Sequence, residues 1–407
     1  MDSVAVIGAS LAGLRAIETL RKEGFDGQIW LVGDEGELPY DRPPLSKQVL
    51  SGEWTADQAL LTTHESLDEL GVTRFLRDPA VGLTVEPLAV SLASGLELMP
   101  DGVIIATGAR PRTIDTPLAG VHTLRTLEDA AAVAAAMQDM QDAGSPNGAG
   151  RVVVVGGGFI GAEVAAAARG RDLDVTLVEM AEVPFERALG ADVGGVVADV
   201  HREHGVDVRT GVGCAGFQAR EDDAGHVGAV ELTDGSIVEA DLVVVGIGVI
   251  PNINWLLGSD LTLDNGVCCD ETLLAAPGIV AAGDVAEWSN PRFGEVLRVE
   301  HWDNAVTSGQ HAARRLLHGE AAGAYDPVPW FWSDQYDRKI QLAGRTTGFD
   351  SFQVVEGDFA SRRFAAIYGR DGVFTAVVGM NRPRHVIKYR QLLTAGATWD
   401  EALAAEI

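Results

Sequence analysis

Two glycine-rich turns, each placed between an apolar run and a helix-like segment, constrain the fold of this chain more than any other feature. The first turn, Gly8-Ala-Ser-Leu-Ala-Gly13, follows an apolar run at 4–7, and the second, Gly156-Gly-Gly-Phe-Ile-Gly161, follows one at 152–155. A strand, a tight glycine turn and a helix begin a βαβ unit that binds a dinucleotide pyrophosphate at the helix N-terminus. Two copies predict two bound dinucleotides.

The first copy departs from the usual pattern at one position. Gly8 permits the tight turn and Gly13 lets helix and strand pack closely, but Ser10 stands where a glycine normally lets the backbone approach the pyrophosphate. The helix continues to about Lys22, and the next strand is expected at 29–32. A nucleotide site remains the favoured interpretation of this imperfect match.

The second copy is complete and adds an acid. Gly156, Gly158 and Gly161 fill all three glycine positions, and the following strand at 173–178 ends in Glu179. A carboxylate at that point accepts hydrogen bonds from the ribose 2′-hydroxyl of NAD and repels the 2′-phosphate of NADP. The second site is therefore predicted to bind NAD.

A flavin dinucleotide is the expected partner of NAD, because hydride passes readily between a nicotinamide and a flavin. Two later segments support a flavin at the first site. The run at 103–108 ends in Ala-Thr-Gly with Thr107 and Gly108, and the run at 278–285 contains Gly283-Asp284. Asp284 can bind the ribityl hydroxyls of FAD, since open α/β sheets place ligands at the carboxyl ends of strands.

Composition excludes several other functions. A length of 407 residues predicts two or three domains, and the formal charge of −28 (31 Lys and Arg against 59 Asp and Glu) disfavours nucleic-acid binding. We find no apolar run of roughly 18 residues and no leader-like N-terminus, which predicts a cytoplasmic protein with no membrane contact. Cys214, Cys268 and Cys269 have neither disulfide-framework nor metal-ligand spacing, so no metal and no thiol redox chemistry are expected.

Four further stretches are the most specific in the chain: Pro39-Tyr-Asp-Arg-Pro-Pro-Leu-Ser-Lys47, Gly283-Asp-Val-Ala286, Glu300-His-Trp-Asp-Asn-Ala305 and Pro329-Trp-Phe-Trp-Ser-Asp-Gln335. In these, the sequence resembles the FAD-dependent NADH:ferredoxin reductases of oxygenase systems, and the resemblance covers essentially the whole chain. It implies an α/β fold with two Rossmann-like dinucleotide-binding domains, arranged as in glutathione reductase, plus a C-terminal α+β domain.

The resemblance also implies the domain limits. The FAD-binding domain is expected to be discontinuous, at 1–112 and 245–323, with the NAD-binding domain at 113–244 and a C-terminal ferredoxin-docking domain at 324–407. Within the last domain, strands are expected near 353–355 and 374–378 and a closing helix near 398–406.

By the same resemblance, Lys47 lies near the flavin ring and pairs with Glu163, where its ammonium would stabilise the reduced flavin. Trp302 and Trp332 are placed beside the isoalloxazine, and Arg42 and Arg125 at the FAD phosphates. Either Asp34 or Glu35 should hold the adenine-side ribose. The predicted FAD residues are Gly8, Ser10, Gly13, Asp34, Glu35, Arg42, Lys47, Thr107, Gly108, Arg125, Gly283, Asp284 and Trp302; the predicted NAD residues are Gly156, Gly158, Gly161, Glu163 and Glu179.

The charge balance changes in the last domain. Basic and acidic residues are equal in number from Ala324 onward, and every formal charge between Asp371 and Asp400 is positive. A solvated surface explains most such runs, but a dock for an acidic ferredoxin fits this domain better. The predicted docking residues are Arg338, Lys339, Arg382, Arg384, Lys388 and Arg390.

The function implied is transfer of hydride from NADH to FAD and of single electrons to a [2Fe–2S] ferredoxin, which serves a cytochrome P450 or a ring-hydroxylating dioxygenase. A rubredoxin reductase or diaphorase has the same flavin core and stays an alternative. An NADH-responsive signalling flavoprotein is disfavoured, because those proteins carry targeting sequences and a long insertion in the last domain. A monomer or weak dimer is expected.

Overall fold

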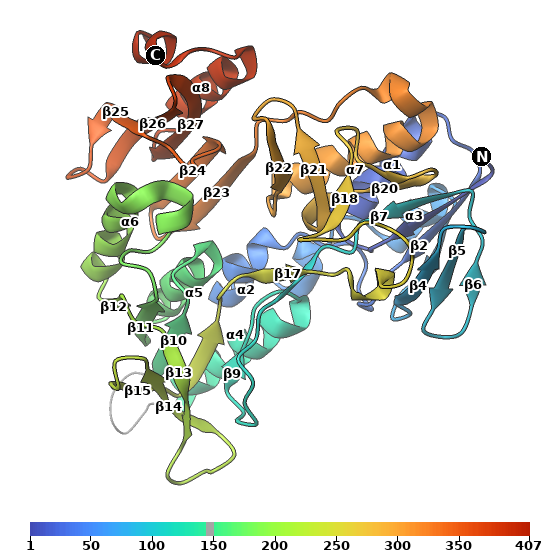
Figure 1. The fold of residues 1–407 in the computed structure, drawn as a ribbon. Coiled ribbons are helices and arrows are strands. Elements are labelled where there is room, and N and C mark those ends of the chain that lie inside the picture. Colours follow the sequence, from blue (N-terminus) through green and yellow to red (C-terminus); the bar gives the residue numbers. More distant parts are fainter. Residues whose placement is uncertain (144–149) are drawn as a thin grey trace. The chain divides into compact units, whose positions relative to one another are not determined.

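The computed structural model describes residues 1–143 and 150–407, which form two compact units (Figure 1). Each unit contains one sheet of mainly parallel strands, and one strand of each sheet leads into a predicted glycine turn. The first unit comprises Met1–Asp41, Ala59–Arg110 and Ile250–Pro329, and the second comprises Arg42–Gln58, Pro111–Val249 and Trp330–Ile407.

A six-stranded sheet with the order β19-β20-β7-β1-β2-β3 forms the centre of the first unit. All neighbouring strands run parallel except β19, which pairs antiparallel with β20. The central strands are almost wholly apolar because other elements cover both faces of the sheet. The strands are β1 (Ser3–Ile7), β2 (Gln28–Val32), β3 (Val72–Phe75), β7 (Gly102–Ile105), β19 (Leu274–Ala276) and β20 (Ile279–Ala281).

Helices α1 (Leu11–Lys22) and α7 (Trp302–His318) pack against each other beside this sheet. Leu14, Ile17 and Leu20 recur at helical spacing on α1 and are fully buried. Gly309 of α7 lies so close to α1 that a Cβ there would come within 2.4 Å of the Ala12 carbonyl oxygen. This close contact fixes the first turn of α1, directly after the first glycine turn.

Smaller elements complete the first unit. Two three-stranded sheets, β4-β5-β6 and β18-β21-β22, flank the central one. Strand β8 pairs with β17, and each of these two strands has one residue assigned to the second unit. Their bounds are β4 (Ala80–Thr84), β5 (Ala89–Leu92), β6 (Glu97–Leu98), β8 (Ala109–Pro111), β17 (Val249–Pro251), β18 (Val267–Cys269), β21 (Ala286–Asn290) and β22 (Glu295–Arg298), with helix α3 at His64–Glu69.

The second unit contains a five-stranded parallel sheet in the order β12-β11-β10-β16-β9. The helix that follows the second glycine turn is α5 (Phe159–Gly170). The strands of this sheet are β9 (Val121–His122), β10 (Arg151–Val155), β11 (Asp174–Glu179), β12 (Asp207–Thr210) and β16 (Leu242–Val245). The other helices of this part are α2 (Gln48–Ser51), α4 (Leu127–Ala143) and α6 (Glu186–Glu203). A separate three-stranded sheet consists of β13 (Cys214–Ala219), β14 (Val227–Leu232) and β15 (Ile237–Glu239).

An antiparallel sheet with the order β23-β24-β27-β26-β25 forms the C-terminal part of the second unit. Phe331 and Phe364 of this sheet share one hydrophobic core with Val193 and Val197 of α6. The bounds are β23 (Trp330–Gln335), β24 (Arg338–Gly344), β25 (Ser351–Asp358), β26 (Arg363–Arg370), β27 (Val373–Met380), α8 (Pro383–Ala395) and α9 (Trp399–Leu403).

The C-terminal elements are longer than the sequence predicted, with one exception. The strands expected at 353–355 and 374–378 lie inside β25 and β27. The closing helix is shorter than expected and ends at Leu403; its N-cap Thr398 and Glu401 form a reciprocal capping box. Helix α8 was not predicted as an element, although it carries much of the basic segment.

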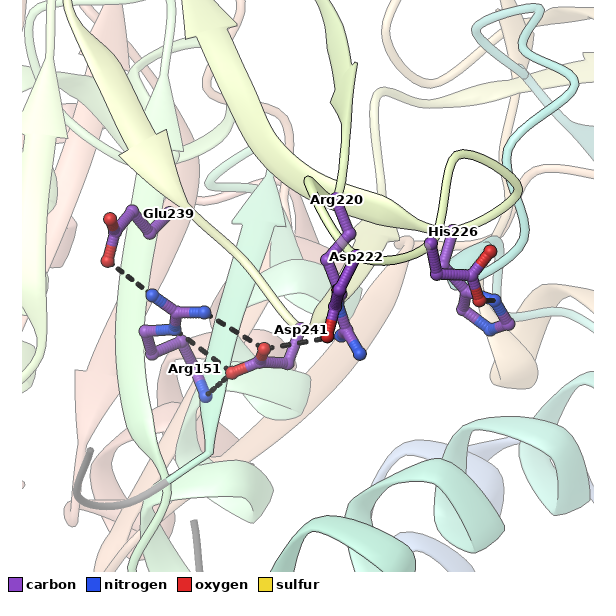
Figure 2. Close-up of polar contacts among 7 residues, drawn as sticks. Arg151, Arg220, Asp222, His226, Glu239 and Asp241 are labelled. Atoms are coloured by element: carbon purple, nitrogen blue, oxygen red, sulfur yellow. Dashed lines mark hydrogen bonds and ion pairs between the residues drawn. The ribbon is translucent and has the colours of Figure 1, made fainter. Parts of the chain in front are cut away.

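A network of ion pairs joins β10 to β16 at the amino ends of these strands (Figure 2). The Arg151 guanidinium donates from Nε to Oδ2 and from Nη2 to Oδ1 of Asp241, both at 3.0 Å, and also contacts Glu239. Arg220 adds a contact to Asp241 at 3.3 Å. Burial alone would raise the pKa of Asp241, but the side-chain and backbone hydrogen bonds from Arg151 bring that pKa below its ordinary value.

Within residues 1–143 and 150–407, no helix combines the length and the apolar character that crossing a membrane requires. The same residues contain no cluster of three or more His, Cys, Asp or Glu side chains that could hold a metal ion.

Candidate functional site

The first glycine turn is built so that only glycines fit at its two ends. Gly8 has a φ of +125°, and a Cβ there would lie 2.1 Å from the Ala106 carbonyl oxygen. A Cβ on Gly13 would lie 2.1 Å from the Gly8 carbonyl oxygen. Ser10 is the N-cap of α1, with an extended backbone. The turn thus presents the positive N-terminal end of α1 at the carboxyl end of β1, which suits a pyrophosphate.

The other predicted residues of the first unit follow neighbouring strands at the same edge. Thr107 and Gly108 follow β7, and the Thr107 hydroxyl donates to the Asn252 carbonyl oxygen at 2.9 Å. Gly283, with a φ of +72°, and Asp284 follow β20, and the Gly283 N–H donates to the Ser308 hydroxyl at 2.8 Å. The structure therefore brings these loops together with the first glycine turn.

Asp34 and Glu35 follow β2 at this edge as well. The Asp34 carboxylate accepts a hydrogen bond from the Glu35 N–H at 3.1 Å, and the Tyr40 hydroxyl donates to Glu35. Trp302, the first residue of α7, is half-buried, and its indole N–H donates to the Asp41 carboxylate at 2.7 Å.

The second glycine turn has the same construction and a tighter link to its acid. Cβ atoms on Gly156 and Gly161 would lie 2.3 and 2.0 Å from backbone oxygens, whereas none of the described residues lies within 4 Å of a Cβ built on Gly158. Glu179 accepts hydrogen bonds from the Gly157 N–H at 2.6 Å and the Ala181 N–H at 2.8 Å. An anionic acceptor beside an open glycine N-cap fits a dinucleotide with a free ribose 2′-hydroxyl.

Lys47 and Glu163, which the resemblance paired, lie in contact within the second unit. The Glu163 carboxylate on α5 is buried, and its Oε2 accepts from Lys47 Nζ at 2.6 Å and from the Ser46 hydroxyl at 2.5 Å. Its Oε1 accepts from the Ser333 hydroxyl at 2.6 Å. Lys47 Nζ also donates to the Pro43 carbonyl oxygen at 3.1 Å.

Three serines near these sites were missed by the sequence analysis. Ser46, Ser308 and Ser333 are all buried and all bond a predicted site residue. Ser46 and Ser333 fall inside two of the specific stretches, which is the only sequence signal that could have indicated them.

Arg42, Arg125 and Trp332 belong to the second unit. Arg42 donates to the Arg125 carbonyl oxygen at 2.5 Å, and the Asp129 carboxylate accepts from the Arg125 N–H at 2.8 Å. The ring of Trp332 lies 5.2 Å from that of Trp330. The predicted FAD residues are thus divided between the two units.

Four residues of the predicted basic dock contact other side chains of the second unit. Arg338, Lys339 and Arg382 form ion pairs with Asp337, Asp334 and Glu356. Arg390 stacks over the Trp330 ring, at 5.5 Å from its centroid.

Arg384 and Lys388 are exposed and lie one turn apart on α8. Their spacing of four residues places both on one face of this helix. Lys339 on β24 is exposed as well.

The cysteines are poor candidates for redox chemistry. Cys269 lies on β18, where burial raises the pKa of its thiol far above the ordinary value. The neighbouring Cys268 thiol donates to Glu287 at 3.5 Å, and burial followed by that carboxylate raises its pKa too. Raised pKa values disfavour the thiolates that thiol chemistry needs.

Comparison with known families agrees with this architecture. The model of the pyridine nucleotide-disulphide oxidoreductases matches residues 2–309, and the model of the reductase C-terminal domain matches residues 330–407. The chain belongs to the pyridine nucleotide-disulphide oxidoreductase family. It is an enzyme, a flavoprotein oxidoreductase that uses FAD and NAD(H).

Relatives within this family are similar over most of their length. The chain is 37% identical to rhodocoxin reductase of Rhodococcus erythropolis, covering 96% of this chain and 89% of the relative. It is 36% identical to the ferredoxin–NAD(+) reductase component of the anthranilate 1,2-dioxygenase system of Burkholderia cepacia, covering 100% of this chain and 97% of the relative.

Solved structures give the same result. Putidaredoxin reductase in its covalent complex with putidaredoxin matches with a TM-score of 0.89 and 33% identity, covering 97% of this chain and 93% of that one. The ferredoxin reductase for the CYP199A2 system of Rhodopseudomonas palustris matches with a TM-score of 0.91 and 34% identity, covering 98% of this chain and 96% of that one. The predicted family and fold are confirmed.

Proposed function

We propose that this enzyme takes hydride from NADH and passes electrons singly to a [2Fe–2S] ferredoxin, which in turn serves a cytochrome P450 or a ring-hydroxylating dioxygenase. The observation that carries the proposal is the combination, in one chain, of two glycine-turn nucleotide sites and a reductase C-terminal domain. Relatives that match this chain nearly end to end are named as the ferredoxin reductases of a dioxygenase system and of the CYP199A2 system.

The first glycine turn and the loops of Thr107 and Asp284 would hold FAD, with the pyrophosphate at the N-terminus of α1. When bound, FAD would supply the step between a two-electron donor and a one-electron acceptor. The protein's part is to bind and orient both nucleotides, and the Lys47 ammonium would tune the flavin electrostatically. The proposed FAD-binding domain comprises residues 1–112 and 245–323, the NAD-binding domain 113–244 and the ferredoxin-docking domain 324–407.

NADH is proposed as the coenzyme because the Glu179 carboxylate, at the end of β11, would repel the 2′-phosphate of NADPH. Its carboxylate is already fixed by two backbone N–H groups, so it cannot easily rotate away from a phosphate. A ribose hydroxyl could still donate to its remaining lone pairs.

The ferredoxin is proposed to dock on the C-terminal domain at the face that carries Arg384 and Lys388. These two charges are exposed, and a small, weak interface is typical of electron-transfer partners. A cytoplasmic monomer or weak dimer is part of the same proposal, which gel filtration and cell fractionation would check.

A panel of acceptors tests the proposal. The purified enzyme, with its FAD content measured, is given NADH anaerobically with a [2Fe–2S] ferredoxin, a rubredoxin or ferricyanide. Fast reduction of the ferredoxin supports the proposal. Reduction of rubredoxin or ferricyanide alone would instead assign a rubredoxin reductase or a diaphorase.

A further inference from the structure

A continuous line of buried hydrogen bonds runs from Glu163 to helix α6. The Ser333 hydroxyl donates to Glu163 Oε1 at 2.6 Å, and Gln335 Nε2 donates to the Ser333 hydroxyl at 3.1 Å. His201 Nε2 lies 3.0 Å from Gln335 Oε1, and His201 Nδ1 lies 3.0 Å from the Tyr336 hydroxyl. All of these residues belong to the second unit.

The line has only one consistent direction. Because Gln335 uses its amide N–H₂ toward Ser333, its Oε1 must accept from His201, which places the imidazole proton on Nε2. The other ring nitrogen, Nδ1, then accepts from the Tyr336 hydroxyl. Every donor therefore points toward the Glu163 carboxylate, and aligned hydrogen bonds of this kind strengthen one another.

The residues that form the line are shielded from solvent. Glu163 is 4% exposed, Gln335 is 1% exposed, and Ser333 and His201 are fully buried. Ser333 and Gln335 alternate with the outer residues of β23, so both point to one face of that strand. The His204 ring, which stacks on Tyr336 at 3.7 Å, closes the far end.

We propose that Ser333, Gln335 and His201 are positioning residues that hold the Glu163 carboxylate in the orientation in which its other oxygen binds Lys47. The inference rests on the proposed function, since it deepens the role given there to Lys47. These three residues link the C-terminal sheet and α6 to the Lys47–Glu163 pair, so the geometry of that pair depends on the packing of the C-terminal sheet.

Removal of one hydrogen bond from this line would change the orientation of the Glu163 carboxylate. Without the Ser333 hydroxyl, Glu163 Oε1 would be a buried acceptor with one fewer donor, and the carboxylate would gain by rotating toward other donors. Rotation would draw Oε2 away from Lys47 and Ser46. The ammonium would then occupy several positions, and its stabilisation of the reduced flavin would weaken.

The test measures the two-electron midpoint potential of the flavin in the FAD-loaded enzyme, in a double-mutant cycle of Ser333→Ala and Lys47→Met. We expect Lys47→Met to lower the equilibrium constant for flavin reduction about tenfold, or about 30 mV. Ser333→Ala should lower it about fivefold, or about 20 mV. In the Lys47→Met background, Ser333→Ala should have no further effect.

Two further variants keep the result interpretable. Thr346→Val is the matched control, because it removes a buried hydroxyl that donates to the Ala188 carbonyl oxygen at 2.8 Å in the same unit, and the potential should not change. Gln335→Leu cuts the next link and should shift the potential in the same direction as Ser333→Ala; it replaces that variant if Ser333→Ala fails to bind FAD.

The outcomes separate the inference from the proposed function. An unchanged potential in Lys47→Met contradicts the role proposed for Lys47 itself. A shift in Lys47→Met with none in Ser333→Ala or Gln335→Leu overturns the positioning role alone. Equal effects of Ser333→Ala in both backgrounds also overturn it, because Ser333 would then not act through Lys47.

Discussion

At the scale of single residues, Glu179 illustrates how a carboxylate can be fixed before its ligand arrives. It accepts N–H groups from the glycine turn and from Ala181, so its charge faces the end of β11 where a ribose would lie. Under the proposed function, the choice of coenzyme would depend on this one side chain, whose orientation the backbone sets.

We predict that Glu179→Gln and Glu179→Arg reduce the preference for NADH over NADPH. A charge-assisted hydrogen bond contributes about 1.5–3 kcal/mol, so the ratio of the two kcat/KM values should fall at least about tenfold. Steady-state ferricyanide reduction with each coenzyme measures that ratio. An unchanged ratio in Glu179→Arg would exclude the assigned role.

His201 is a residue whose protonation should influence stability. Burial chiefly lowers its pKa to about 4, against the raising effect of the Gln335 hydrogen bond and with a smaller lowering by His204. The unfolded chain therefore binds a proton between about pH 6.5 and 4 that the folded chain does not. Stability should fall as the pH falls through this window, and the His201 contribution should reach up to about 3 kcal/mol.

Comparison of His201→Gln with the wild type isolates this contribution, because carboxylates titrate in both. Urea unfolding at pH 7 and pH 4.5 should show a smaller loss of the free energy of unfolding in His201→Gln. The exposed His64, changed to Gln, serves as the control and should behave like the wild type. Parallel losses in all three proteins would show that His201 is not the group responsible.

At the scale of elements, the Arg151 network fixes one end of the NAD-type sheet while the glycine turn occupies the other (Figure 2). Arg151→Met leaves the partly buried Asp241 without its main donors. We predict a loss of about 2 kcal/mol in the free energy of unfolding. Arg209→Met, which removes an exposed pair with Asp207, should cost less than about 0.5 kcal/mol. Similar losses for both variants in urea unfolding would contradict the anchoring role.

The exposed basic residues of helix α8 are expected to bind the ferredoxin. We predict that Lys388→Glu lowers kcat/KM for ferredoxin about three- to tenfold, because the reversed charge repels an acidic partner, and that the loss shrinks with added salt. Lys22→Glu, an exposed reversal on α1 in the other unit, is the matched control. NADH–ferricyanide activity should stay unchanged in both. Equal effects of the two reversals would remove α8 from the docking surface.

At the scale of the whole molecule, the parts that could be predicted from sequence are those that local pattern determines. Gly8, Gly13, Gly156 and Gly161 indicate both nucleotide turns because a side chain at each would collide with backbone atoms. Glu179 follows from its place at the end of a strand.

The remainder depends on tertiary packing that spacing does not encode. Gln335 hydrogen-bonds both Ser333 and His201 because β23 packs beside α6, and no periodicity indicates that arrangement. The basic run appeared uniform in sequence, yet Arg382 pairs with Glu356 and Arg390 with Trp330, which the one-dimensional pattern cannot show. The contact between Lys47 and Glu163 was predicted from the resemblance to the family, and composition alone does not indicate it.

The most direct test of the central claim is the number of ferredoxin molecules reduced per NADH oxidised, measured anaerobically with catalytic amounts of the enzyme. One hydride carries two electrons and a [2Fe–2S] ferredoxin accepts one, so the account predicts about two ferredoxins per NADH. Oxidation of NADH while the ferredoxin stays oxidised would contradict it.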